Sequence, residues 1–182
     1  MKSIAAGIFA ELGAAGPLYA ILDGARDSRI RGWALDTRLP AWCLYRGDLP
    51  VALENAAPWL LRLPAGHPAL EVFFSRGWGN AWGILLASGA PSRDLRRHLR
   101  RFLRVRTEEG RILAFRYYDP RVLRAYLPTC TKEEIGGFFG PVSAFVAEEE
   151  GGGEAHFFRR SKAGLEDRLV PLSQPAAEAR AR

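Results

Sequence analysis

The chain has 182 residues, of which 48% are hydrophobic and 25% are charged, and this composition is typical of a soluble globular protein with a hydrophobic core. Its formal charge is +6, but residues 93–106 alone hold seven arginines and one aspartate, so the rest of the chain is neutral. Cys43 and Cys130 are far apart and belong to no CxxC motif, which argues against a disulfide scaffold or a cysteine metal site.

The apolar segment at the N-terminus is interrupted by Glu11, unlike a signal peptide, so the sequence argues against export, and the cysteine pattern favours a reducing compartment. The longest uncharged run, residues 77–92, is too short and too polar to span a bilayer. We therefore expect no membrane insertion.

In the first half, apolar runs that end at glycine or proline alternate with segments of helical pattern. Strands are predicted at residues 17–24, 41–47, 58–64 and 81–88, and helices at 25–35, 49–57 and 67–77. This alternation is typical of an α/β domain with a largely parallel or mixed sheet.

The second half has the pattern of antiparallel hairpins. Residues 102–118 form two apolar runs around a turn that contains Gly110, and residues 141–160 form a second hairpin around an acidic, glycine-rich connection. Between them, a proline start predicts a helix at 120–127, and a capping box of Thr131 and Glu134 predicts another.

We therefore predict a single α/β domain with a mixed sheet, strands and helices alternating in the first half and antiparallel hairpins in the second. Its expected divisions are a leader at residues 1–16, the domain at 17–162, and a C-terminal extension at 163–182 that is disordered at its end.

The arginine-rich segment predicts an amphipathic helix that Ser92 can cap. Its apolar arc consists of Leu95, Leu99, Phe102 and Leu103, and its basic arc consists of Arg96, Arg97, Arg100, Arg101 and Arg104. The basic arc fits three interpretations: the solvated side of a structural helix, a surface that docks a protein, or a phosphate-binding stripe. Because no stacking aromatics or reading module accompany it, we favour the first two over nucleic acid.

The stretch GWGNAWG, residues 77–83, resembles a phosphate loop, but its third glycine comes one residue late and the helix precedes the strand. We interpret it as a helix-to-strand turn whose Trp78 and Trp82 either pack or anchor a partner. In FRYYDPR, residues 115–121, Asp119 is expected to cap a helix and to pair with Arg116 or Arg121. This is either a plain strand-to-helix junction or a polar centre exposed to a protein partner.

No nucleophile elbow, HExxH motif or carboxylate pair is present, so the sequence predicts no enzyme. A Cys43 or Cys130 nucleophile with His67, His98 or His156 is possible in three dimensions, but nothing in the sequence supports it.

Five segments resemble, in order and spacing, the type VI secretion effector-adaptor chaperones, known as the Tap or TEC family. They are LYAILDGARDSRI, APWLLRLP, GWGNAWGILLAS with LRRHLRRFLRVR, GRILAFRYYDPRVLRAYLP, and FFGPVSAFV, and they span residues 17 to about 147. The family residues that match are Asp23, Trp78, Gly79, Trp82, Gly83, Arg97, Arg101, Arg116, Tyr118, Asp119, Pro120 and Arg121.

The resemblance implies a cytoplasmic, non-enzymatic adaptor that binds a toxic effector and helps load it onto the VgrG spike. It implies no cofactor, no metal and no catalytic residue, and neither nucleic acid nor membrane as a partner. The candidate partner-binding residues are Trp78, Trp82, Arg96, Arg97, Arg100, Arg101, Arg104, Arg116, Tyr118, Asp119 and Arg121. The alternative function is a small nucleic-acid-binding protein that uses the Arg93–Arg106 helix.

Overall fold

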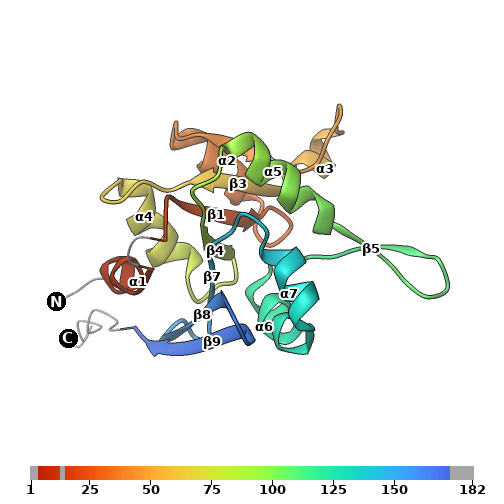
Figure 1. Cartoon of the computed structure of the whole chain (residues 1–182). Helices are drawn as coiled ribbons and strands as arrows, with labels where there is room; N and C mark the ends of the chain where they lie inside the picture. Colours follow the sequence, from red (N-terminus) through yellow and green to blue (C-terminus); the bar gives the residue numbers. More distant parts are fainter. Residues whose placement is uncertain (1–3, 13–14, 173–182) are drawn as a thin grey trace.

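The computed structural model describes residues 4–12 and 15–172 of the chain (Figure 1). Its helices are α1 (Ile4–Leu12), α2 (Arg29–Asp36), α3 (Val51–Asn55), α4 (Pro68–Val72), α5 (Ser92–Leu99), α6 (Pro120–Tyr126) and α7 (Lys132–Phe139). Short π or 3₁₀ turns follow three of them: η1 (Phe73–Gly77), η2 (Arg100–Phe102) and η3 (Leu127–Thr129). The strands are β1 (Leu18–Asp23), β2 (Ala41–Cys43), β3 (Pro58–Arg62), β4 (Gly83–Ala87), β5 (Arg104–Arg106), β6 (Ile112–Ala114), β7 (Ala144–Glu148), β8 (Glu154–Ser161) and β9 (Gly164–Pro171).

Seven of these strands form one sheet in the order β2-β3-β1-β4-β7-β8-β9. Leu22 lies between Trp59 of β3 and Gly83 of β4, and Leu85 of β4 pairs with Val146 of β7. The α/β class, the early alternation and the late hairpins are confirmed. Every described strand pair is antiparallel, however, so the parallel pairing expected for a mixed sheet is absent from the described residues.

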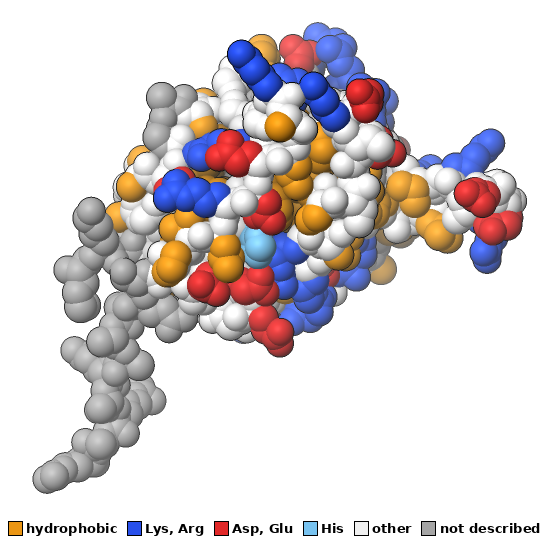
Figure 2. All heavy atoms as spheres, turned by 60° about the horizontal axis from the view of Figure 1, so that its bottom comes forward, with side chains coloured by type: hydrophobic (Ala, Val, Ile, Leu, Met, Phe, Trp, Pro, Cys, Tyr) orange, Lys and Arg blue, Asp and Glu red, His pale blue; other side chains and the backbone are white. Residues whose placement is uncertain are grey.

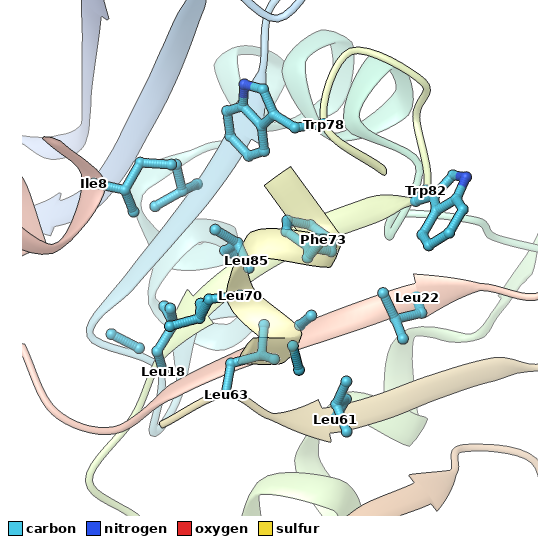
Figure 3. Close-up of a cluster of buried hydrophobic side chains, with 14 of the residues drawn as sticks. Ile8, Leu18, Leu22, Leu61, Leu63, Leu70, Phe73, Trp78, Trp82 and Leu85 are labelled. Carbon is cyan, nitrogen blue, oxygen red and sulfur yellow. The ribbon is translucent and has the colours of Figure 1, made fainter. Parts of the chain in front are cut away.

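Helices cover both faces of this sheet. Because side chains alternate along a strand, Ala20 and Leu22 of β1 pack in one cluster and Tyr19 and Ile21 in another. The first cluster joins the sheet to α1, α2 and α4, and the second joins it to α5, α6 and α7. The domain is therefore a three-layer α/β/α sandwich. Figure 3 shows part of the first cluster.

Local signals in the sequence placed most elements correctly. Asp119 caps α6, the capping box of Thr131 and Glu134 begins α7, and Gly110 adopts a positive φ of 81° in the β5–β6 turn. The β5–β6 hairpin forms its own two-stranded sheet rather than an edge of the main one, and it stands away from the body of the molecule (Figure 1).

At the two ends, the structure adds two elements. Residues 4–12 of the expected leader form α1, whose Ile8 and Leu12 are buried, and β9 extends the sheet past residue 162 by pairing with β8. The expectation of disorder at the end of the chain concerns residues 173–182, which lie outside the described residues. Within the described ranges, no helix is long and apolar enough to cross a membrane.

Candidate functional site

Trp78 and Trp82 belong to the core, and each is only 6% exposed. The indole N–H of Trp78 donates to the carbonyl oxygen of Gly152 at 2.9 Å, and the ring of Trp82 lies 5.6 Å from that of Trp33. Figure 3 shows Trp78 on one side of Phe73 and Trp82 on the other, with Leu22 near Trp82. The packing interpretation of this turn is therefore confirmed, and the role of the two tryptophans as partner anchors stays a prediction.

The backbone of the same turn binds a carboxylate from within the chain. The N–H groups of Gly79 and Ala81 donate to the two carboxylate oxygens of Glu148, at 2.6 and 2.7 Å. Positive φ values of 82° at Gly79 and 54° at Ala81 accompany this geometry. The loop that resembles a phosphate site is thus filled by Glu148, at the end of β7, whose pKa is raised by burial against the opposing effect of these two hydrogen bonds.

Asp119 and Arg121 form a closed unit at the start of α6. The Asp119 carboxylate accepts from the backbone N–H of Arg121 at 3.0 Å and forms an ion pair with its guanidinium at 2.6 Å. Burial alone would raise the pKa of Asp119, but the hydrogen bonds and charge of Arg121 outweigh it, so this pKa lies below its usual value. Pro120 occupies the first helical position, where a missing N–H costs nothing.

Arg116, the other expected partner of Asp119, forms its ion pair with Asp23 instead. Asp23 ends β1 with a fully buried side chain, whereas the Arg116 side chain is 43% exposed. The hydrogen bond to Asp23 raises the pKa of Arg116. Tyr118 is buried, and desolvation, with a further contribution from Tyr45, raises its pKa.

The Trp-Gly turn at residues 77–83 and the FRYYDPR junction at residues 115–121 meet at one end of the sheet. Asp23 ends β1, Gly83 begins the adjacent β4, and Glu148 ends β7 on the other side of β4. The charge of Asp119 acts on Glu148, and that of Arg121 acts on both Asp23 and Glu148. We call Asp23, Arg116, Asp119, Arg121 and Glu148 the polar centre. Because its acids are buried and paired, its first effect is to fix the turn, the junction and the strand ends together.

The α5 arginines divide into an inward and an outward group. The Arg100 guanidinium donates to the carbonyl oxygens of Leu44 and Cys43 at 2.9 and 3.0 Å, and the Arg96 guanidinium lies 5.0 Å from the ring centroid of Trp42. These two side chains attach the helix to β2 and to Leu44 directly after it, so they do not form part of a free basic arc.

The outward group consists of exposed arginines that follow the helix and continue onto the hairpin. They are Arg93, Arg97, Arg101, Arg104 and Arg106. Arg97 forms an exposed ion pair with Asp94 at 2.8 Å, and Arg101 lies near the ring of Phe102. The expected apolar arc is confirmed, because Leu95, Leu99 and Leu103 are buried and Phe102 is half-buried.

Two details of the predicted helix are wrong. Ser92 is its first residue and makes no capping hydrogen bond, because Pro91 occupies the N-cap position. The α-helix also ends at Leu99, so Arg104 begins β5 rather than continuing the basic arc.

The histidines and cysteines have local structural contacts. His98 is buried against the carbonyl oxygen of Phe138 at 2.8 Å, and burial lowers its pKa, while His67 caps α4. Desolvation raises the pKa of both thiols, Cys43 and Cys130, which disfavours the nucleophilic thiolate. Among the described residues, no group of His, Cys, Asp and Glu side chains could hold a metal ion.

An apolar groove of about 730 Å³ lies between α1 and α4, beside the β7–β8 turn. Trp78 lines it together with Phe9, Leu70 and Phe74, so one edge of this tryptophan reaches a hollow of the surface.

Sequence reasoning missed several residues that organise these surfaces. Glu148 and Glu149 lie in an acidic run that resembles a solvated loop, yet Arg124 donates to the backbone carbonyl of Glu148 and forms an ion pair with Glu149 at 3.1 Å. Trp42 lies in β2, an ordinary short strand, and Tyr45 follows it. The one available signal was the position of Glu148 directly at the end of the apolar run AFVA.

The fold and these contacts define an α/β/α domain with an antiparallel sheet and a polar centre where the turn meets the junction. Over residues 18–136 the sequence matches the family described as a domain of unknown function, DUF4123, and the chain belongs to this family. The comparison with curated proteins and the comparison with solved structures gave no match.

Proposed function

We propose that this protein is an adaptor chaperone of type VI secretion, which binds a toxic effector in the cytoplasm and promotes its loading onto the VgrG spike. In this proposal the protein has no enzymatic activity, uses no cofactor and binds no nucleic acid. The observation that carries it is the family match over residues 18–136, which covers the Trp-Gly turn, the arginine helix and the FRYYDPR junction on which the resemblance to these adaptors rests.

The distribution of contacts supports a binding role. In the polar centre, Asp23, Asp119 and Glu148 are each paired with groups of the same chain, which suits a rigid support better than a reaction site. The outward arginines and the β5–β6 hairpin, in contrast, face solvent. Arginine is enriched at protein interfaces, where it steers association and fixes register.

Co-purification tests the proposal. The tagged protein is expressed with the product of an adjacent toxin gene or with a VgrG protein, and the expected result is a stable complex with the toxin that survives gel filtration. A complex with neither protein would refute the proposal. The nucleic-acid alternative predicts binding to DNA or RNA that weakens with salt. The slope of log binding constant against log salt concentration would then reflect several phosphate contacts, and an Arg97→Glu/Arg101→Glu variant would lose this binding.

A further inference from the structure

The β5–β6 hairpin is a two-stranded ribbon with both edges open. In the part of the chain that the structure describes, no third strand pairs with β5 or β6. Figure 2 shows the ribbon at the right, standing out from the body of the molecule with hydrophobic, basic and acidic side chains along it. Isolated two-stranded ribbons are marginally stable in water, and open strand edges are templates for pairing with another chain.

The two faces of this ribbon differ. Directly opposite residues of an antiparallel pair share a face, so Val105 and Leu113 lie on one face. The pairs Arg104 with Ala114 and Arg106 with Ile112 lie on the other. We call these the apolar face and the basic face.

The apolar face continues out of the core. Toward the core, the next pair on this same face is Leu103 with Phe115. Leu103 is buried, and the Phe115 ring lies 4.8 Å from that of Tyr126. Beyond it, Val105 is 41% exposed and Leu113 is 47% exposed. A row of apolar side chains thus passes from the core into solvent, where nothing in the described chain covers it.

The hydrogen-bond pattern identifies which backbone groups point outward. Phe115 donates to Leu103, and Thr107 donates to Arg111, so these are the closely bonded pairs of the ladder. Bonded and non-bonded pairs alternate in an antiparallel ladder. The N–H and C=O groups of Arg104 and Arg106 therefore point away from β6, toward the open edge of β5.

We propose that the edge of β5 is a docking site for an extended segment of a partner protein in which acidic and apolar side chains alternate. The segment adds as a third strand, with its acidic side chains beside Arg104 and Arg106 on the basic face and its apolar side chains beside Val105. Neighbouring strands place such side chains about 5 Å apart, which suits ion pairs and apolar contacts. This site rests on the proposed function, in which the segment belongs to the effector.

Charge complementarity selects this occupant over a second copy of the chain. Two β5 edges paired with each other would bring arginines of the two copies together, and like charges on adjacent strands are destabilising. The long edge strand β9 of the main sheet is a poorer template for strand addition. Its exposed charged side chains disfavour pairing with another chain, and they belong to Glu166, Asp167 and Arg168. The β5 edge has both the exposed apolar side chain and the cations that an acidic, extended segment requires.

Proline substitution tests the pairing with little damage to the ribbon. In Arg106→Pro the lost N–H is one that points outward, so no hydrogen bond of the β5–β6 ladder is removed. The matched control is Ile112→Pro, which removes an outward N–H from the opposite edge, that of β6. A second pair of variants changes only charge: Arg104→Glu/Arg106→Glu on the ribbon, and Arg160→Glu/Lys162→Glu at exposed positions of the β8–β9 hairpin as its control.

Two probes are used with each variant. One is a fluorescent ten-residue peptide with alternating glutamate and valine, and its control has lysine in place of glutamate; the other is the toxin from the co-purification test. We expect the acidic peptide and the toxin to bind the wild type, and Arg106→Pro and the ribbon charge reversal to weaken both by about tenfold or more. Ile112→Pro and the reversal at Arg160 and Lys162 should leave the binding of the acidic peptide and of the toxin unchanged. The lysine peptide should not bind the wild type.

Other outcomes separate the two proposals. If the toxin binds wild type and all ribbon variants equally, the β5 site is wrong while the adaptor function stands. If Ile112→Pro is the variant that loses binding, or the acidic peptide shows no saturable binding to the wild type below about 1 mM, the β5 site is also wrong. If the wild type binds neither toxin nor spike, the adaptor function is wrong, and the peptide measurement alone decides whether the β5 edge accepts an acidic strand.

Discussion

Removal of the Glu148 carboxylate tests whether the Trp-Gly turn is held by an internal anion. Glu148 is 4% exposed and accepts the N–H groups of Gly79 and Ala81. In Glu148→Ala both donors lose their partner, and a buried orphaned donor costs about 1–3 kcal/mol. Water can reach the N–H of Gly79, which is exposed, more easily than that of Ala81, which is buried. We therefore assign a cost of about 1 kcal/mol to the unpaired N–H of Gly79 and about 2 kcal/mol to that of Ala81. The expected loss in the free energy of unfolding is therefore about 3 kcal/mol.

Urea unfolding followed by tryptophan fluorescence measures this loss, and thermal unfolding should show a decrease in Tm of roughly 6–12 °C for a chain of this length. The matched control is Glu150→Ala in the next loop, an exposed position where the change should stay within about 0.5 kcal/mol. If Glu148→Ala were as stable as this control, the carboxylate would not hold the turn, and the account of the polar centre would be refuted.

Glu148→Gln separates the hydrogen bonds from the charge. Glutamine keeps one accepting oxygen and removes a buried charge, so it should cost less than alanine, about 1 kcal/mol at pH 7. Since burial raises the Glu148 pKa, the native state binds more protons than the unfolded state between the ordinary and the raised value. Wild-type stability from this group therefore falls as pH rises through that window, and the deficit of Glu148→Gln should be larger near pH 4.5 than at pH 7.

Two further predictions concern the other clusters. Arg100→Ala should destabilise the protein by about 1–2 kcal/mol in urea, because the Leu44 and Cys43 carbonyls lose their donors, whereas Arg97→Ala on the solvent side should stay within about 0.5 kcal/mol; equal effects would contradict the inward and outward division. The Asp119 pKa is lowered in the folded state, so its stabilisation is present above the ordinary carboxyl value of about 3.9 and is lost as pH falls through the folded value. The stability gap between wild type and Asp119→Asn should accordingly narrow in urea titrations below about pH 4, and a constant gap would contradict the Arg121 pairing.

The sequence predicted well those features that arise within a few residues. The cap at Asp119, the capping box of Thr131 and Glu134, and the Gly110 turn each join groups two to four positions apart. Such signals depend on local backbone geometry, which the residue types alone constrain. They were enough to place most elements and to identify the α/β class.

The order and direction of the strands depended on contacts that no local pattern records. Alternating strands and helices suggested parallel pairing, but α3, which connects β2 to β3, has only five residues and joins antiparallel neighbours. A parallel crossover needs a connection of about a dozen residues or more, usually with a helix, and the connection at residues 44–57 meets this requirement. The length of the connection therefore allowed both directions, and the pairing depended on which strands the folded sheet brings side by side.

The polar centre was only partly predictable from the sequence. Asp119 pairs with Arg121, one of its two expected partners, but Arg116, the other, pairs with Asp23, which is 93 positions away. The turn amides bind Glu148 across 67 to 69 positions. Spacing in the sequence cannot choose between a near and a distant carboxylate, because the choice depends on which strand ends the sheet brings together.

The arginine-rich segment shows how one stretch of sequence can serve two purposes. Its inward residues, Arg96 and Arg100, attach α5 to β2 and to Leu44, while Arg104 and Arg106 lie on a ribbon beyond the core. A binding strand gains affinity when its support is rigid, because less ordering is lost on association. The contacts of Arg96 and Arg100 support α5, the chain then continues into β5, and the outer backbone edge of β5 is unpaired in the described residues. The net positive charge of the protein is therefore concentrated where a rigid base meets an unpaired edge, which is the arrangement that capture of an acidic, extended segment requires.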